Sequence, residues 1–315
     1  MRTSPRRILS GTSCSPRMYL LSKSVMKTTL ITRAIGIGVV FCYSALHSTI
    51  TTTTGTARFS ASAMSMNNIM PRKDIRIFCY GDSLTAGSFP PDDELHPYGP
   101  HLERTLTESL VQKCGSQTQQ SQPCNIEVSS DSSGDRTDPP KVAVRWIGLP
   151  GWTARGMMQY ADDPEIGLRP AIRKVQNPSL SLVIILAGTN DLAMEAGSTD
   201  GKGSERIAND VIGLHKIAHA SGIPTLAVSI PPSGWQATSA NAHALATDTN
   251  AKIEAWCDST ERAHFVKHPI ESWSRDDARW AYDGLHFSAK GYQEIGESLA
   301  PVVYQILLPN TNRNQ

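Results

Sequence analysis

The first 73 of the 315 residues contain no aspartate or glutamate, and the first acidic residue is Asp74. Ten lysines and arginines occupy that stretch, so a basic head precedes a body with 20 basic and 29 acidic residues. Such a body lacks the clustered lysine and arginine side chains that neutralise phosphates. We therefore expect no nucleic-acid partner.

Long apolar runs are also missing. The best candidate in the head, residues 34–46, has thirteen apolar or small residues, whereas a transmembrane helix needs about 20. A run of this length, preceded by basic residues, is typical of a signal peptide. We expect residues 1–73 to be a targeting or disordered segment. As a cleaved presequence it would direct the protein to the secretory pathway or an organelle, and a cytoplasmic location is the alternative. No membrane span is expected in the body.

Six cysteines are too few and too scattered for a disulfide framework. Cys79 lies in an apolar run and is expected to be a small buried side chain. Cys114 and Cys124 flank or lie within a polar stretch, residues 114–140, which is rich in Ser, Gln and Asp. This stretch can bury little apolar surface, so we predict a surface insertion. Spacing alone leaves open whether the two cysteines form a disulfide.

Several common catalytic motifs are absent. The chain has no Gly-x-Ser-x-Gly, no Walker loop and no His-Glu-x-x-His. His215 and His219 have the spacing of two zinc ligands on a helix, but no glutamate or third ligand accompanies them. We expect these histidines on a solvated helix face. No metal and no cofactor is therefore expected.

The chain does contain apolar runs that alternate with helical patterns from residue 75 onward. Strands are predicted at 75–80, 142–147, 180–187, 224–230 and 264–266, and helices at 98–113, 205–220, 241–259 and 288–308. The continuous apolarity of 180–187 is typical of a strand that is covered on both faces. This alternation indicates an α/β protein with a parallel sheet of about five strands between helical layers.

Polar turns follow three of these strands. Ser83 comes after the first strand, Gly151 after the second and Asn190 after the third. The carboxyl ends of parallel strands share one edge of an open sheet, and ligands bind at that edge. We interpret Asp82 as a turn residue and Asp191 as a residue that caps or braces its own turn.

These turns hold the side chains that a serine esterase requires. A serine hydroxyl needs a base such as histidine, and a carboxylate must orient that histidine. Asp283 and His286 are three residues apart, whereas Ser83 is far away along the chain and must meet them through the fold. The backbone N–H groups of Ser83 and Gly151 and the side-chain amide of Asn190 can supply an oxyanion hole.

Four segments in this order resemble the sequence blocks of the SGNH (GDSL) hydrolase family. They are Gly81-Asp82-Ser83-Leu84, Gly151, Gly188-Thr189-Asn190-Asp191 and Asp283-x-x-His286. The residues before Gly151, Trp146 to Pro150, are more similar to the arylesterase-type subgroup than to members with an asparagine shortly before that glycine.

The resemblance implies a flavodoxin-like three-layer α/β/α fold for a hydrolase domain at residues 74–308, followed by a tail at 309–315. It implies hydrolysis through an acyl-enzyme, with Ser83 as nucleophile, His286 as base and Asp283 as its partner. Ser83, Gly151 and Asn190 would form the oxyanion hole.

The expected activity is hydrolysis of small to medium acyl esters, with a small-molecule or lipid ester as substrate. A lysophospholipase or thioesterase on the same machinery is one alternative, and a non-catalytic SGNH-like binding domain is another. The natural acyl and alcohol groups and the oligomeric state stay open. So does the choice among four tryptophans as pocket walls, namely Trp152, Trp235, Trp273 and Trp280.

Overall fold

The computed structural model describes residues 74–117, 140–175 and 179–308. The basic head, most of the polar stretch 114–140, the side chains of Cys114 and Cys124, and the tail 309–315 lie outside the described part.

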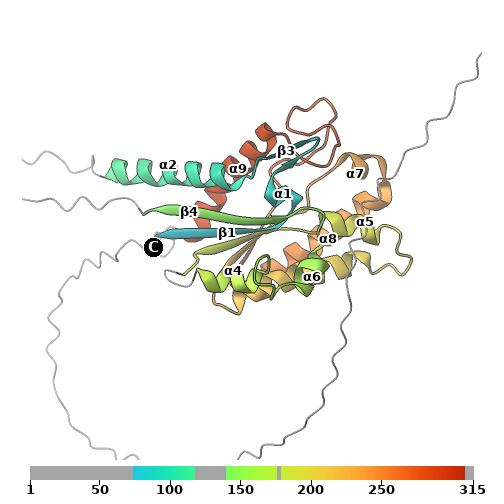
Figure 1. The fold of residues 1–315 in the computed structure, drawn as a ribbon, viewed down its shortest axis with the longest axis horizontal. Helices are drawn as coiled ribbons and strands as arrows, with labels where there is room; N and C mark the ends of the chain where they lie inside the picture. Colours follow the sequence, from blue (N-terminus) through green and yellow to red (C-terminus); the bar gives the residue numbers. More distant parts are fainter. Residues whose placement is uncertain (1–73, 118–139, 176–178, 309–315) are drawn as a thin grey trace, which may run out of the picture. The chain divides into compact units, whose positions relative to one another are not determined.

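Five parallel strands form the central sheet, in the order β4-β1-β5-β6-β7 (Figure 1). They are β1 (Ile75–Asp82), β4 (Val142–Leu149), β5 (Leu182–Leu186), β6 (Thr225–Val228) and β7 (Ala263–Val266). Taken along the chain, this spatial order is 2-1-3-4-5, which is the flavodoxin-like order. The predicted α/β fold with a parallel sheet of about five strands is confirmed.

Side chains alternate between the two faces of the sheet. In β1, Ile75, Ile77 and Cys79 join one core cluster, whereas Phe78 and Tyr80 join the other. Burial on both faces explains why the strands read as nearly continuous apolar runs. Burial also raises the pKa of the Cys79 thiol to about 12, so Cys79 is a packing residue, as predicted.

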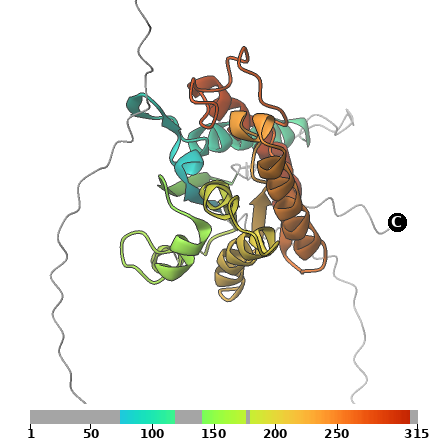
Figure 2. The ribbon, with the colours of Figure 1, turned by 90° about the vertical axis from the view of Figure 1, so that its right-hand side faces the viewer.

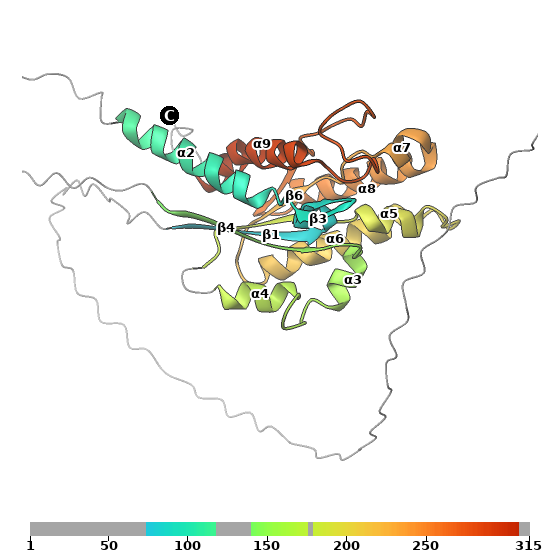
Figure 3. The ribbon, with the colours of Figure 1, turned by 45° about the horizontal axis from the view of Figure 1, so that its top comes forward.

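The helices form two layers (Figure 3). One core cluster joins the sheet to α2 (Gly99–Gln117) and α9 (Ala289–Leu307). The other joins it to α3 (Ala154–Gln159), α4 (Leu168–Lys174), α6 (Gly203–His219) and α8 (Ala240–Asp258). We call these the α9 layer and the α6 layer. The arrangement is the predicted α/β/α sandwich.

The carboxyl edge of the sheet, which faces the viewer in Figure 2, carries short elements that the sequence did not predict. These are α1 (Ser83–Ala86), the hairpin β2 (Ser88–Phe89) and β3 (Asp92–Leu95), α5 (Thr189–Glu195) and α7 (Gly234–Thr238). Elements of one or two turns have too few residues to show a period. The helix predicted to end at residue 113 also continues to Gln117.

The prediction of a solvated face for His215 is wrong. This residue of α6 has 0% exposed surface, its ring lies beside Trp256 with centroids 5.5 Å apart, and burial lowers its pKa to about 3. His219 is partly exposed and its Nε2 lies 3.0 Å from Thr225 Oγ1. Within residues 74–117, 140–175 and 179–308 we find no cluster of His, Cys, Asp or Glu that could hold a metal ion.

None of the helices in the described ranges combines the length and the apolar character that crossing a membrane requires.

Candidate active site

Ser83 is the first residue of α1 and directly follows β1. Asp82 caps this short helix, because its Oδ1 accepts a hydrogen bond of 2.9 Å from the N–H of Leu84. At Gly81 a Cβ atom would lie 1.9 Å from the carbonyl oxygen of Leu186 in β5. Glycine therefore lets the strand approach its neighbour closely just before the nucleophile candidate.

Asp82 is fully buried, and burial raises its pKa to about 7, although the hydrogen bond from Leu84 opposes the rise. Its side chain serves as the N-terminal cap of α1. The interpretation of Asp82 as a turn residue is therefore confirmed.

Ser83, His286 and Asp283 form one hydrogen-bonded row. His286 Nε2 lies 2.9 Å from Ser83 Oγ, and His286 Nδ1 lies 2.7 Å from Asp283 Oδ2. The other carboxylate oxygen of Asp283 accepts hydrogen bonds of 3.0 Å from the N–H groups of Leu285 and His286. Residues that are distant along the chain thus meet at one edge of the sheet.

Burial and hydrogen bonding act on the pKa of Asp283 in opposite directions. Burial raises its pKa, but the hydrogen bond with His286 and the two backbone N–H groups outweigh burial and lower the pKa to about 2. At neutral pH the carboxylate is ionised and accepts the proton on Nδ1. With a proton on Nδ1, the imidazole presents the lone pair of Nε2 to the hydroxyl.

The turn that carries Asp283 and His286 is held by backbone bonds and by an indole ring. The carbonyl of Gly284, which has φ of 68°, accepts a hydrogen bond of 2.7 Å from the N–H of Gly234. Trp273 stands against both glycines, because a Cβ atom would lie 3.0 Å from its ring at Gly234 and 3.1 Å at Gly284. No ion pair other than the one between Asp283 and His286 involves the described residues of this turn.

The residue after His286 anchors the turn in the α9 layer. The ring of Phe287 is fully buried, stacks on His268 at 5.1 Å between centroids and tilts against Trp280 at 4.4 Å. Burial lowers the pKa of His268 to about 4, although the hydrogen bond between its Nδ1 and the carbonyl of Ile270, 3.2 Å, opposes this change. His268 is thus neutral at neutral pH and packs as an aromatic side chain. Trp280, a candidate pocket wall, lies in this core.

Gly151 lies in a tight turn between β4 and α3. The N–H of Trp152 donates 3.1 Å to the carbonyl of Leu149, with Pro150 and Gly151 as the two central residues. Proline followed by glycine at φ 79° defines a type II turn, which favours glycine at its third position. A Cβ atom at Gly151 would meet nothing within 4 Å, so open space lies in front of the turn.

Two backbone N–H groups are candidate donors at this edge. The amide of Ser83 is at the start of a helix, where amides have no intrahelical partner. The amide of Gly151 is the central amide of the type II turn, and among the described residues it donates no hydrogen bond to another protein atom. Both groups are of a kind suited to a negatively charged oxygen.

Asn190 lies in the first turn of α5, after β5. Its Nδ2 donates a hydrogen bond of 2.9 Å to the carbonyl of Trp152. An amide nitrogen carries two hydrogens, so the second hydrogen stays available for a ligand. The sequence indicated Asn190 as a donor but carried no signal for its bond to the Gly151 turn.

Sequence reasoning found Ser83, Asp283 and His286, and the structure brings them into one row. Gly151 and Asn190 lie together because of the Trp152 bond. Sequence reasoning missed that Asp191 accepts hydrogen bonds from the start of α3. A hydroxyl, an imidazole, a carboxylate and three donors form an arrangement that can perform acyl transfer by nucleophilic attack.

Comparison with known families assigns the chain. The model of the GDSL-like Lipase/Acylhydrolase family matches residues 79–294. This protein belongs to that family. The match begins in β1 and ends in α9, so it includes Ser83, Gly151, Asn190, Asp283 and His286. The GDSL-like protein is therefore a hydrolase that acts on ester bonds, an SGNH enzyme as the sequence predicted.

Three solved structures illustrate the similarity. The native aryl esterase of M. smegmatis has 22% identity and a TM-score of 0.46, covering 74% of this chain and 100% of its own. A carbohydrate acetylesterase from Sinorhizobium meliloti has 18% identity and a TM-score of 0.46, with the same coverage of 74% and 100%. The lipase/acylhydrolase from Enterococcus faecalis has 18% identity and a TM-score of 0.45, covering 73% and 95%. None of the curated proteins compared with this chain matches it.

Proposed function

We propose that this GDSL-like hydrolase is a serine-dependent carboxylic esterase that cleaves small to medium acyl esters through an acyl-enzyme. The observation that carries the proposal is the row of hydrogen bonds from Ser83 Oγ to His286 Nε2, 2.9 Å, and from His286 Nδ1 to Asp283, 2.7 Å. These distances match those of a nucleophile, a base and the group that orients the base.

In the first half-reaction, Ser83 Oγ attacks the ester carbonyl carbon while its proton moves to His286 Nε2. Asp283 stabilises the imidazolium that forms. The carbonyl oxygen becomes negatively charged and accepts hydrogen bonds from the amides of Ser83 and Gly151 and from Asn190 Nδ2. Each such donor is worth about 3 kcal/mol of transition-state stabilisation.

Collapse of this intermediate breaks the bond to the alcohol oxygen, which takes the proton from His286. A water molecule then gives its proton to His286 and attacks the acyl carbon of the ester on Ser83. The same donors hold the second oxyanion. Release of the carboxylic acid returns the proton to Ser83 Oγ, so no net proton is left on the enzyme.

Burial of the nucleophile supports a small acyl group. Ser83 is only 6% exposed, so an acyl carbon that reaches Oγ must fit a restricted space. The arylesterase-like residues before Gly151 agree with this size. A lysophospholipase or thioesterase is the alternative, because the same edge exposes 76% of Met194 and 77% of Tyr282, and these apolar surfaces would suit a longer chain.

The test uses Ser83→Ala and p-nitrophenyl acetate. Hydrolysis should fall to near background while circular dichroism shows an unchanged fold, and a fluorophosphonate probe should label the wild type but not the variant. Retained activity in the variant would reject Ser83 as nucleophile. An inactive, unlabelled wild type would favour the non-catalytic binding domain.

A series of p-nitrophenyl esters from acetate to palmitate separates the two substrate classes. We expect kcat/KM to be highest for the shortest chains. A maximum at eight carbons or more would favour the lipid alternative.

We also propose that residues 1–73 are a cleaved presequence, on the basis of their basic character and the apolar run at 34–46. Sequencing the amino terminus of the protein purified from its source should give a start after that run. A start before residue 34 would contradict the proposal.

A further inference from the structure

The amino end of α3 obtains its hydrogen-bond acceptors from two different elements. Thr153 caps the helix in the ordinary way, because its Oγ1 accepts 3.0 Å from the N–H of Gly156. The two amides before Gly156 bond instead to a residue of α5. Ala154 donates 2.8 Å to Asp191 Oδ2, and Arg155 makes a longer contact of 3.5 Å with Asp191 Oδ1. All three otherwise unpaired amides are thereby satisfied.

Asp191 and its neighbour Asn190 hold the same segment, one side chain as an acceptor and the other as a donor. Asn190 donates to the carbonyl of Trp152, and Asp191 accepts from the amides that begin two residues later. Both come from the first turn of α5. The segment between Gly151 and Arg155 is therefore fixed to α5 by one donor and one acceptor from adjacent residues.

This fixation matters because the proposed oxyanion hole draws on separate elements. The Gly151 amide belongs to the turn after β4, while the Asn190 amide belongs to the helix after β5. The strands that lead to them, β4 and β5, are not neighbours in the sheet, because β1 lies between them. A displacement of about 1 Å between such groups can cost 10²-fold in rate.

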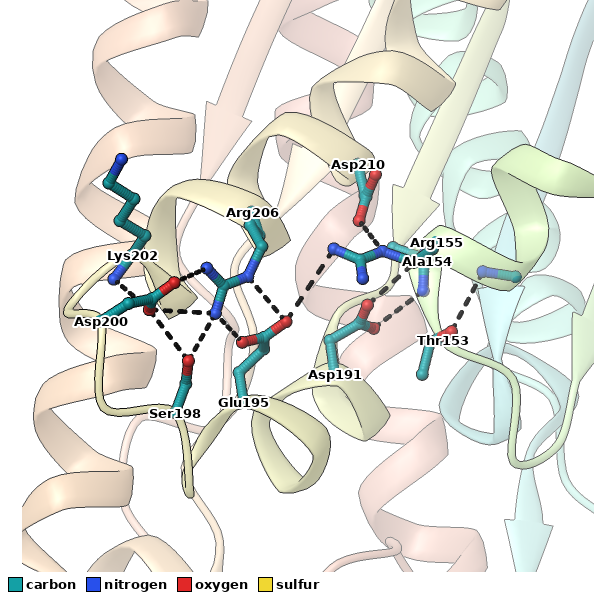
Figure 4. Close-up of polar contacts among 11 residues, drawn as sticks. Thr153, Ala154, Arg155, Asp191, Glu195, Ser198, Asp200, Lys202, Arg206 and Asp210 are labelled. Atoms are coloured by element: carbon teal, nitrogen blue, oxygen red, sulfur yellow. Dashed lines mark hydrogen bonds and ion pairs between the residues drawn. The ribbon is translucent and has the colours of Figure 1, made fainter.

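A network of ion pairs begins at Arg155 and extends along α5 and α6 (Figure 4). The side chain of Arg155 contacts Asp210 on α6, Nε to Oδ2 at 3.2 Å, and Glu195 on α5 at 3.9 Å. Glu195 in turn forms a two-point pair with Arg206, which also contacts Asp200. These partners are more exposed than Asp191, which is 4% exposed. Of these carboxylates, only that of Asp191 accepts hydrogen bonds from the backbone at the start of α3.

We propose that Asp191 is a positioning residue of this esterase: it sets the distance between the Gly151 and Asn190 donors by holding the start of α3 against α5. The inference rests on the proposed oxyanion hole. It gives Asp191 a role at the start of α3 that the sequence alone did not suggest.

The test is Asp191→Asn, which keeps the shape of the side chain but replaces one acceptor oxygen with an NH₂ group that repels the α3 amides. We expect kcat for p-nitrophenyl acetate to fall about 10- to 100-fold with KM changed less than about 3-fold. Affinity for a boronic acid, which adds to Ser83 and mimics the tetrahedral intermediate, should fall by about the same factor as kcat.

Two matched variants separate positioning from general loosening. Thr153→Ala removes the ordinary cap of α3 and should lower the unfolding temperature while kcat stays within about 2-fold. Asp210→Asn makes the same chemical change on the other side of Arg155 and should leave kcat within about 2-fold. If either control lowers kcat as much as Asp191→Asn, the assignment to Asp191 is overturned.

A double-mutant cycle gives the decisive readout. Because both residues act on one oxyanion hole, the fold-losses in kcat caused by Asp191→Asn and Asn190→Ala should not multiply. The kcat of the double variant should be at least about 5-fold higher than the value expected from multiplying the two single losses. Full multiplication would overturn the inference. If Asp191→Asn does not fold, Asp191→Ser, which keeps one small acceptor, replaces it in the same cycle.

Failure of the proposed function gives a different result. An inactive wild type, or an active Ser83→Ala, rejects the esterase mechanism itself. An active wild type that depends on Ser83, together with an unaffected Asp191→Asn, rejects only the positioning role.

Discussion

The α6 layer and the α9 layer contribute different halves of the site and hold them by different forces. On the α6 side, Asp191 and Asn190 fix the Gly151 turn with side-chain hydrogen bonds, and ion pairs of Arg155 surround them. On the α9 side, Trp273 packs on Gly284, and Phe287 is buried beside His268. The oxyanion half is held by side-chain hydrogen bonds with ion pairs around them, and the base half is held by backbone hydrogen bonds and packing.

This difference teaches how each half should respond to substitution. Packing tolerates little change of volume, so the base half should be sensitive to a single methyl group. Exposed ion pairs are screened and individually weak, so most of the oxyanion half should tolerate neutral replacements. Asp191 is the exception, because it is buried and contacts backbone. The following variants test this contrast, beginning with the largest effect.

Asp283→Asn should cause the largest loss, about 10²- to 10⁴-fold in kcat, because the amide favours the wrong tautomer of His286. The pKa of Asp283, lowered to about 2, also means that the wild type should not lose this carboxylate above pH 4. Steady-state kinetics between pH 4 and 9 check both points. A kcat of the variant within 10-fold of the wild-type value would show that Asp283 does not orient His286.

Gly284→Ala should reduce kcat by about 10-fold and destabilise the fold by about 1–3 kcal/mol, because φ of 68° strains alanine and its Cβ would meet Trp273. Kinetics and urea unfolding measure the two effects. Gly222→Ala is the matched control, since φ there is 73° but the nearest atom is 3.9 Å away. It should lose stability without losing kcat. Equal activity of both variants would contradict the importance of packing at the turn.

Glu195→Gln should have a small effect, with kcat within about 3-fold of the wild type. The hydrogen bond from Arg206 lowers the pKa of Glu195, so the pair is charged at neutral pH. The difference in thermal stability from the wild type should shrink between 0.05 and 1 M NaCl as screening increases. A large loss of kcat would show that charge is as critical in the outer network as it is at Asp191.

His215→Leu should leave kcat at pH 8 within about 2-fold but change the acid stability. The pKa of His215 is about 3 in the fold, against about 6.5 when unfolded. Between these values the unfolded chain binds the extra proton, so the free energy of unfolding decreases as pH falls, by up to about 1.4 kcal/mol per pH unit. The variant should lose this slope in urea unfolding measured from pH 8 to 4. An unchanged slope would show that His215 is protonated in the fold.

Most of the sheet could be predicted from the chain because buried parallel strands are apolar on both faces. The predicted strand at 142–147 and the observed β4 agree to within two residues, and Ser288 caps α9 as a serine before a helix should. The residues of the site also carried a clear signal, since each stands where a strand or turn ends. The strand order itself followed only from the resemblance.

What could not be predicted depends on contacts between distant segments. Asp191 looks the same in sequence whether it accepts from its own turn or from α3, and only the fold decides. His215 lies on a helix whose apolar stripe is wide enough to include it, and its neighbour Trp256 comes from α8. Helices as short as α1 depend on their caps and on the strand beneath rather than on a repeat.

The acid and the base share a single turn, and Asp283 binds both the ring and the main chain of His286. Any excursion of that turn would carry the two side chains as one body, with the imidazole proton still bonded to its carboxylate. The hydrogen bond between His286 and Ser83 would then be the only contact of the row that breaks. When the turn returned, that bond would form again without rotation of the imidazole ring.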